Sequence, residues 1–283
     1  YIGTRNLSTG AKLFRTRDFG VIEAVIDDGF GKYENQGIYG LCEHRNQLYV
    51  GTFNWQGAEI YRTTEGSAFQ LILDSGGDDP LNVDFFSFAS WNGSIYTGTC
   101  NLRVNESLAF VGTDDFANGA KIYRSIEGDA WKKVHSNFFP KSNFIRSFEV
   151  FGDCLFAATG RFEQPWSLLK TRDGANWETI TFPKFNQHQD SPIIISFAGR
   201  LFCFLGECRN LIPFKLCFYD GRQLIDARLD EFGNKNNVAV MSAIVFREAL
   251  FVTTRNYTDG LEIWKTSDGY QWTQITSGMP IDN

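Results

Sequence analysis

The chain has 283 residues, of which 43% are hydrophobic and 21% are charged, and this composition is ordinary for a globular protein. Its net charge of −6 argues against nucleic-acid binding and against adhesion to anionic membranes. No apolar run approaches the roughly 20 residues that span a bilayer, so we expect no membrane insertion.

Similar phrases recur about every 47 residues, starting with Tyr1-Ile2-Gly3-Thr4. Because residues 1–5 already belong to a repeat, we expect no signal peptide in this sequence. A period of about 40 to 50 residues with short strand-like segments is typical of a β-propeller. We expect one all-β domain over residues 1–283, a six-bladed β-propeller with four-stranded antiparallel blades. The repeats run over 1–35, 36–82, 83–143, 144–189, 190–236 and 237–283.

The second repeat illustrates the expected blade. Short segments rich in β-branched and aromatic residues are separated by Gly, Asn and Asp, as in chains of hairpins. The four strands are predicted at 38–43, 48–52, 58–63 and 69–73. One blade cannot bury both of its faces, so each is expected to pack against its neighbours.

One innermost strand is expected to be absent from this sequence. An Asn opens the first strand of a repeat seventeen positions before the Thr of the second strand, as with Asn35 and Thr52. The sequence starts at a second strand, with Thr4, and ends at Asn283, which leaves 17 − 4 = 13 residues unaccounted for. Three explanations are open. The thirteen residues were cut or are unrecorded at one end, the first blade is genuinely short, or another chain donates the strand. The first option is favoured, because proteins avoid exposed sheet edges.

The six cysteines do not form a disulfide scaffold and contain no C-x-x-C pair. We expect buried thiols. One exception is Cys203 and Cys217, which are placed to lie on paired strands and to bridge in an oxidising compartment. Four glycosylation sequons hint at secretion, so the compartment stays open, with an extracellular or periplasmic location slightly favoured. The sequons lie at Asn6, Asn92, Asn105 and Asn256.

A turn phrase recurs between the third and fourth strands, as Thr266-Ser267-Asp268-Gly269-Tyr270-Gln271-Trp272 and as Thr171 to Trp177. With Glu in place of Asp it recurs in 63–69 and 125–131. This phrase resembles the Asp-box of sialidases and related bacterial propellers, but it is one residue shorter between the acid and the Trp. We expect the acid to accept backbone N–H groups, the Gly to adopt a positive φ, and the Trp to insert between blades. The structural residues are Glu65, Glu127, Asp173, Asp268, Trp131, Trp177 and Trp272.

The resemblance implies that these boxes lie opposite the ligand site and serve enzymes and non-catalytic proteins alike. Sialidases also carry a Phe/Tyr-Arg-Ile-Pro segment near their start. The nearest phrase here, Phe144-Ile145-Arg146-Ser147, lacks the Pro and lies in mid-chain, which argues against sialidase chemistry.

The loops after the second strands are polar in a regular pattern and carry several arginines, which bind carboxylates or phosphates well. The predicted ligand-binding residues are Arg5, Asn54, Arg103, Arg161, Trp166, Arg209 and Arg255. Trp55, Trp166 and Tyr257 are candidates for a platform under sugar rings, with Trp166 expected to be the most exposed. Structural roles remain open as alternatives to ligand binding. The Asn residues can cap the loops, and the aromatic residues can pack between loops.

No catalytic constellation stands out. A glycosidase needs two carboxylates about 5 to 10 Å apart, and the weak candidates are Glu163, Asp190 and Glu207. The three His lack metal-ligand spacing, so we expect no metal. No cofactor is expected, although the oxygens of Asp78, Asp79, Asn82 and Asp84 form an option for Ca²⁺.

The function favoured by these observations is non-catalytic binding of a glycan or a protein segment at the mouth of the propeller channel. A carbohydrate-active hydrolase or lyase, with a carboxylate pair and arginines at the mouth, is the alternative. A third option is a scaffold within a larger assembly.

Overall fold

The computed structural model describes residues 1–17, 21–101, 120–136, 144–161, 164–180, 191–207, 211–227 and 230–279. The chain divides into two units, Tyr1–Ile145 and Arg146–Asn283, and each is described by itself. Nearly all regular structure is antiparallel β-sheet, so the all-β prediction is confirmed. Among the described residues, no helix has the length and apolar character needed to cross a membrane.

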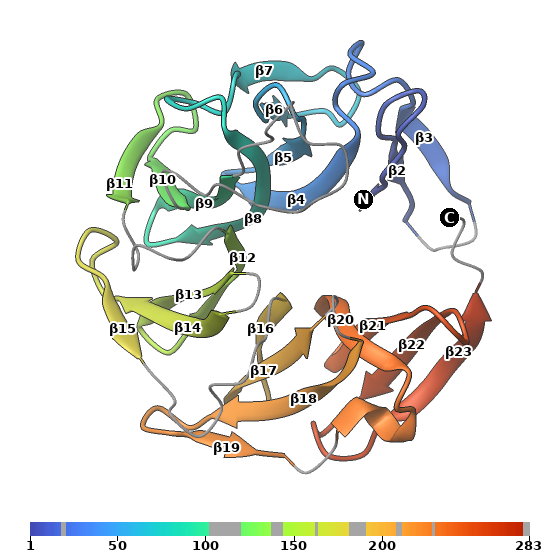
Figure 1. The fold of residues 1–283 in the computed structure, drawn as a ribbon. Helices are drawn as coiled ribbons and strands as arrows, with labels where there is room; N and C mark the ends of the chain where they lie inside the picture. Colours follow the sequence, from blue (N-terminus) through green and yellow to red (C-terminus); the bar gives the residue numbers. More distant parts are fainter. Residues whose placement is uncertain are drawn as a thin grey trace. The chain divides into compact units, whose positions relative to one another are not determined.

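The first unit contains a three-stranded sheet, β1 to β3, and two runs of consecutive strands, β4 to β7 and β8 to β11, that belong to one 12-stranded sheet. Figure 1 shows how these strands follow one another. The three-stranded sheet lies at the N-terminus, where the sequence predicts that one strand is absent. In chain order the strands are β1 (Ile2–Gly3), β2 (Leu13–Arg15), β3 (Glu23–Ile26), β4 (Gly37–His44), β5 (Gln47–Phe53), β6 (Ile60–Thr63), β7 (Gln70–Leu73), β8 (Asn82–Trp91), β9 (Ser94–Asn101), β10 (Lys121–Ser125) and β11 (Lys132–Ser136).

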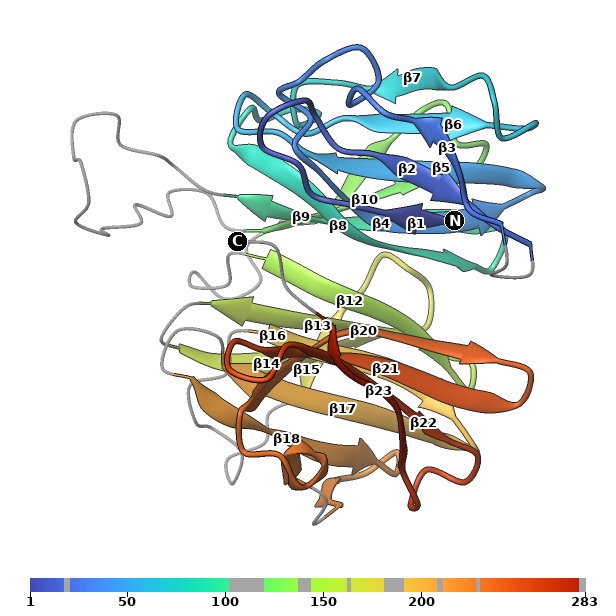
Figure 2. The ribbon, with the colours of Figure 1, turned by 90° about the vertical axis from the view of Figure 1, so that its right-hand side faces the viewer.

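The second unit repeats the four-stranded pattern, again as consecutive antiparallel hairpins (Figure 2). Its first strand begins two residues before the boundary between the units. The strands are β12 (Phe144–Phe151), β13 (Cys154–Arg161), β14 (Gln164–Thr171), β15 (Glu178–Ile180), β16 (Ser191–Phe197), β17 (Arg200–Glu207), β18 (Ile212–Tyr219), β19 (Leu224–Asp226), β20 (Asn237–Phe246), β21 (Ala249–Asn256), β22 (Leu261–Thr266) and β23 (Thr273–Met279). A 3-10 helix, η2 (Asp230–Gly233), precedes β20.

The strands predicted for the second repeat correspond to β4, β5, β6 and β7. Strand β6 begins at Ile60 rather than at Ala58. The reason is that the Ala58 N–H leaves the ladder and donates to the Asn82 carbonyl oxygen at 2.9 Å. Tight turns join the strands: in the β8–β9 hairpin, Asn92 and Gly93 have φ values of 46° and 71°, the left-handed pair that matches the twist of a two-residue hairpin.

The core of each unit lies between neighbouring repeats. Leu13 of the first repeat packs with Ile38, Val50 and Tyr61 of the second. The equivalent cluster between the second and third repeats contains Tyr49. Two further clusters join the fourth repeat to the fifth and the fifth to the sixth. Repeats therefore bury their faces against one another, as short antiparallel sheets must.

Candidate functional site

The four motif turns share a hydrogen bond that sequence reasoning did not assign. In each, the hydroxyl that precedes the acid by two residues accepts the N–H of the turn glycine. The bonds are Gly66 to Thr63 at 2.9 Å, Gly128 to Ser125 at 2.8 Å, Gly174 to Thr171 at 2.9 Å and Gly269 to Thr266 at 2.8 Å. The signal was a hydroxyl at one fixed position in all four phrases.

The acids of the turns differ in what they do. The Asp173 carboxylate accepts the N–H groups of Ala175 and Asn176 at 2.9 and 2.7 Å, and these bonds lower the pKa of Asp173. Asp268 accepts two equivalent bonds at 2.8 Å each. In the turns with Glu, Glu127 forms an ion pair with Arg45 at 2.6 Å, and Glu65 is exposed. The longer side chain of Glu127 therefore reaches a partner outside its own turn.

The tryptophans of the turns pack among aromatic rings of neighbouring strands. The ring centroid of Trp131 lies 6.4 Å from that of Tyr49, which belongs to the preceding repeat. Trp272 lies 6.1 Å from Phe204 of the preceding repeat. Trp177 lies 6.4 Å from Phe148 in β12. For Trp131 and Trp272, these contacts agree with insertion between repeats.

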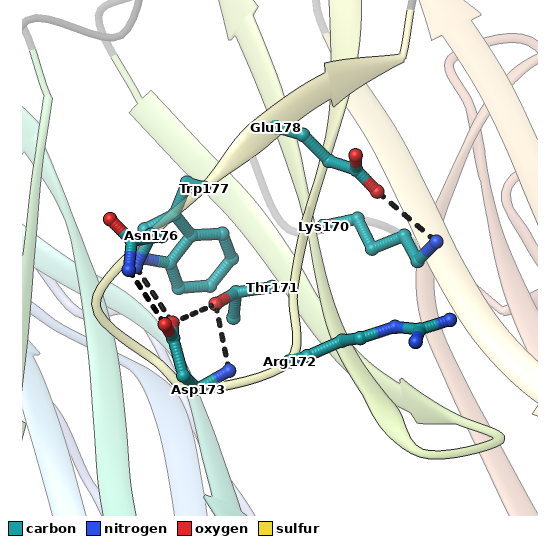
Figure 3. Close-up of a pocket in the computed structure, with 7 residues that line it drawn as sticks. All are labelled: Lys170, Thr171, Arg172, Asp173, Asn176, Trp177 and Glu178. Carbon is teal, nitrogen blue, oxygen red and sulfur yellow. Dashed lines mark hydrogen bonds and ion pairs between the residues drawn. The ribbon is translucent and has the colours of Figure 1, made fainter.

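A pocket of about 430 Å³ lies at the hairpin of β14 and β15 (Figure 3). Lys170, Arg172 and Glu178 extend to one side of this hairpin, and the Lys170 ammonium lies 3.1 Å from the Glu178 carboxylate. The Arg172 side chain is 71% exposed. The lining residues are Lys170, Thr171, Arg172, Asp173, Asn176, Trp177 and Glu178.

Asn54, a predicted ligand contact, instead belongs to a buried polar network. Its amide donates to the Asn35 oxygen at 3.0 Å, and its own oxygen accepts the Gln56 N–H at 2.8 Å. Asn35 in turn donates to Glu59 at 2.7 Å, and Lys32 forms an ion pair with Glu59. Asn54 is only 5% exposed, so the loop-cap alternative describes it correctly.

The carboxylate of Glu59 is 4% exposed in this network. Burial alone would raise its pKa, but hydrogen bonds from Lys32, Tyr61 and Asn35 outweigh burial and lower the pKa. The network therefore keeps a charged carboxylate stable in the interior.

The same network recurs in the next repeat with its charges reversed. Asp79 stands where the earlier network has Lys32, and Lys121 stands on the strand position of Glu59. The Lys121 ammonium lies 2.7 Å from the Asp79 carboxylate, and Asn101 donates to Asn82 at 2.8 Å, as Asn54 does to Asn35.

This arrangement bears directly on the calcium option. Asp78 pairs with Lys133 and Lys121, and Asp79 pairs with Lys121. Asn82 uses its amide on the Gly76 carbonyl, while Asp84 is fully buried in β8. Lysine ammonium groups therefore lie beside the carboxylates of Asp78 and Asp79, which are two of the four residues of the calcium option. Within the described ranges, no group of three or more His, Cys, Asp or Glu side chains is placed to hold a metal.

A third version of the network lies in the last repeat. Asn256 donates to Asn237 at 3.1 Å, and Asn237 donates to Glu262 at 2.8 Å. A neutral side chain, Asn234, replaces the lysine and donates to Glu262 at 2.8 Å. Asn256 is fully buried, so its sequon lies in packed structure.

The candidate site that the described residues do form is an aromatic surface in the first unit. Tyr39 on β4 and Trp55 in the loop after β5 are 40% and 47% exposed. Both rings lie against Phe53, with centroids at 6.3 and 4.9 Å. Tyr39 also lies 5.6 Å from Phe86, its equivalent 47 residues on. The guanidinium carbon of Arg5 lies 5.8 Å from the Phe53 centroid.

We call Arg5, Tyr39, Phe53, Trp55 and Phe86 the aromatic surface. Neighbouring strands hold it in place, because the backbone of Arg5 bridges to Gly37 at the start of β4. Two members, Arg5 and Trp55, were expected from the sequence. Tyr39 and Phe86 were missed, although their spacing of one repeat was a usable signal.

The remaining predicted residues have different positions. Trp166 is 5% exposed and packs in the core with Phe156 and Leu168, so the expectation that it is the most exposed platform residue is wrong. A strand that packs against the next repeat buries its aromatic side chains. Arg255 lies 5.9 Å from the ring centroid of Tyr257, which is 57% exposed.

Several candidates cannot be compared with the structure. Arg103, Arg209, Glu163, Asp190, Asn105 and Cys208 lie outside the described residues. Arg161 and Glu207 lie in β13 and β17, and only their backbone is described. Cys203 and Cys217 pair directly across β17 and β18, as expected, and both side chains are buried.

Comparisons with known proteins show a likeness of fold. No protein-family model and no curated protein matches the chain. Among solved structures, an ancestral GH74 enzyme matches with a TM-score of 0.55 and 15% identity, over 85% of this chain and 32% of that one. A Bacteroides thetaiotaomicron protein of unknown function matches at 0.54 and 9%, over 86% and 58%. A prolyl endopeptidase matches at 0.53 and 10%, over 98% and 42%. The chain spans less than two thirds of each of these proteins.

Proposed function

We propose that the six repeats form a single six-bladed β-propeller of the Asp-box type, and that it binds a carbohydrate without cleaving it. The proposed binding site is the aromatic surface. The observation that carries this proposal is the exposure of Trp55 and Tyr39 on a base of packed aromatic rings.

The chemistry of the surface suits a sugar. One face of a pyranose ring presents C–H groups, which gain free energy when an indole or phenol ring covers them. Because Trp55 and Tyr39 are held by Phe53, little side-chain entropy is lost when a ligand binds. Arg5 is exposed beside these rings, and its guanidinium supplies donors for hydroxyl or acidic groups.

The comparisons support carbohydrate as the ligand class, since the GH74 enzyme is a carbohydrate-active hydrolase. They also motivate the alternative, a hydrolase or lyase that uses Glu163, Asp190 or Glu207. The non-catalytic proposal rests on the aromatic surface, because that surface has its own exposed rings and an arginine but no carboxylate among its five members.

A glycan-array screen of the purified protein tests the proposal, with mass spectrometry of the glycans recovered from the same wells. We expect binding with intact glycans. Trp55→Ala should weaken the affinity at least about tenfold, as expected for a central aromatic contact. Tyr270→Ala is the control, because Tyr270 is 51% exposed in a turn of the second unit and lies outside the aromatic surface.

Each other outcome contradicts a stated part of the proposal. Cleavage of the glycans would refute non-catalytic binding and favour the hydrolase alternative. If Trp55→Ala binds glycans as well as the wild type does, the aromatic surface is not the binding site. If the protein binds no glycan but binds a protein segment, the scaffold alternative is favoured.

A further inference from the structure

Two strands of the first unit carry the same β-bulge at equivalent positions of their repeats. The register between β4 and β5 shifts between Ile38 and Gly40, which makes Tyr39 the extra residue of the bulge. The register between β8 and β9 shifts in the same way around Phe86, 47 residues later. A bulge bends its strand and re-aims the extra side chain. Both bulges therefore present an aromatic ring.

The bulge by itself does not require an aromatic residue. Strand β20 of the last repeat has the same register shift around Met241, which is half-buried. The ladder of β16 and β17 in the fifth repeat runs without a shift. The pair of aromatic residues, Tyr39 and Phe86, is therefore a property of the second and third repeats and not a consequence of the fold.

Glycines bring the two bulges together. A Cβ on Gly40 or on Gly51 would lie 2.5 Å from the Phe85 carbonyl oxygen, so a side chain at either position would push β8 away from β4 and β5. A Cβ on Gly37 would lie 2.9 Å from a ring carbon of Tyr39, so the tyrosine ring lies over this glycine only because it has no side chain. Three glycines therefore make room for the neighbouring strand and for the ring.

The rings of the aromatic surface form a short row that starts at Trp55. Trp55 and Tyr39 both lie edge-to-face with Phe53, at interplanar angles of 78° and 65°. The Tyr39 and Phe86 rings differ in tilt by only 31°, and their centroids are 5.6 Å apart. Phe86 in turn lies 6.4 Å from Phe144, which is 4% exposed, so the accessible row ends at Phe86. The row therefore offers two positions, Trp55 and the pair of Tyr39 and Phe86.

We propose that the aromatic surface binds consecutive rings of a linear β-1,4-linked oligosaccharide, with one sugar on Trp55 and the next on Tyr39 and Phe86. This inference rests on the proposed function and adds the length and linkage of the ligand. A β-1,4-linked chain of pyranose rings is extended, so successive rings can each cover an aromatic face with C–H groups. Because the sugars are joined, the second contact costs no further loss of translational freedom, and affinity rises with length.

Isothermal titration with sugars of increasing length tests the inference. The probes are D-glucose, D-xylose, D-mannose and D-galactose and their linear β-1,4-linked oligomers of two to five residues. In a series that binds, affinity should rise at least about tenfold from one residue to three, which corresponds to about 1.4 kcal/mol. No second tenfold rise is expected from three residues to five, because the next ring in the row, Phe144, is buried.

Two variants assign the gain with length to the second position. Tyr39→Ala should weaken binding of the trisaccharide about tenfold or more and leave the affinity for the monosaccharide unchanged. Trp55→Ala should weaken binding of both. A merely structural role of Tyr39 would instead lower the affinity for every length alike. Tyr270→Ala, which removes an exposed tyrosine outside the aromatic surface, should change neither affinity.

The outcomes separate this inference from the function on which it rests. Equal affinity for all lengths, or a Tyr39→Ala variant that keeps the gain with length, would overturn the inference and leave carbohydrate binding intact. Binding of other glycans on the array, with none of the four series bound, would do the same. If no carbohydrate binds in the titrations or on the array, the proposed function itself fails.

Discussion

The Lys32–Glu59 pair can be reversed experimentally, because the same protein already contains the reversed pair Asp79–Lys121. Glu59→Lys destroys the pair with Lys32 and brings two ammonium groups together. Loss of a fully buried ion pair costs about 3 to 5 kcal/mol, and loss of an exposed one costs about 1 or less. Because Glu59 is 4% exposed and Lys32 is 48% exposed, we expect a loss of about 2 to 3 kcal/mol.

The double variant Lys32→Asp/Glu59→Lys copies the arrangement of Asp79 and Lys121. It should recover about half of the lost stability, which corresponds to a coupling energy above about 1 kcal/mol. Recovery stays incomplete, because the Tyr61 hydroxyl donates to Glu59 and loses that acceptor.

Urea unfolding of the wild type, the two single variants and the double variant measures this coupling. The matched control is reversal of Arg45 and Glu127, a pair of the same unit whose side chains are 46% and 67% exposed. Its coupling should stay below about 1 kcal/mol. The reasoning is refuted if the buried pair couples no more strongly than the exposed one.

Three further predictions concern single side chains. Burial raises the pKa of Glu149 from 4.5 to about 7, so ionisation at higher pH costs about 3 kcal/mol. Stability should therefore fall as pH rises from about 4.5 through 7, and Glu149→Gln should flatten that profile in urea unfolding. Thr266→Val removes the acceptor for the Gly269 N–H and should cost about 1 kcal/mol, whereas Thr266→Ser should restore it; equal stability of the two would contradict the role of the hydroxyl. Burial raises the pKa of the Cys203 thiol, so iodoacetamide at pH 8 should label Cys203 and Cys217 only after unfolding, as peptide mass spectrometry would show.

The strands were predictable because their signals are local. Alternating apolar residues and turn residues located β4, β5 and β7 to within one residue, and the aromatic residues of the turns were assigned to packing. The turn hydroxyls were missed because Thr and Ser are common in loops, and only the backbone geometry shows that Thr63 and Ser125 accept a bond.

The site was harder to predict, because exposure depends on which neighbouring repeat covers a side chain. Trp166 and Trp55 look alike in sequence, since both follow second strands. Trp166 is 5% exposed in a core cluster shared with the fifth repeat, whereas Trp55 remains 47% exposed. Likewise the Asn of the polar loop after β5 has a structural partner that the sequence does not reveal, because Asn54 donates to Asn35.

The reversed polarity of the two networks also limits how this gene can recombine. A crossover that placed the loop containing Lys32 before the repeat containing Lys121 would oppose two ammonium groups. The reciprocal product would oppose Asp79 and Glu59. Crossovers that carry each loop together with the repeat that follows it keep both pairs intact. Exchange of these two repeats therefore keeps both ion pairs at one boundary and opposes two like charges at a boundary a few residues away.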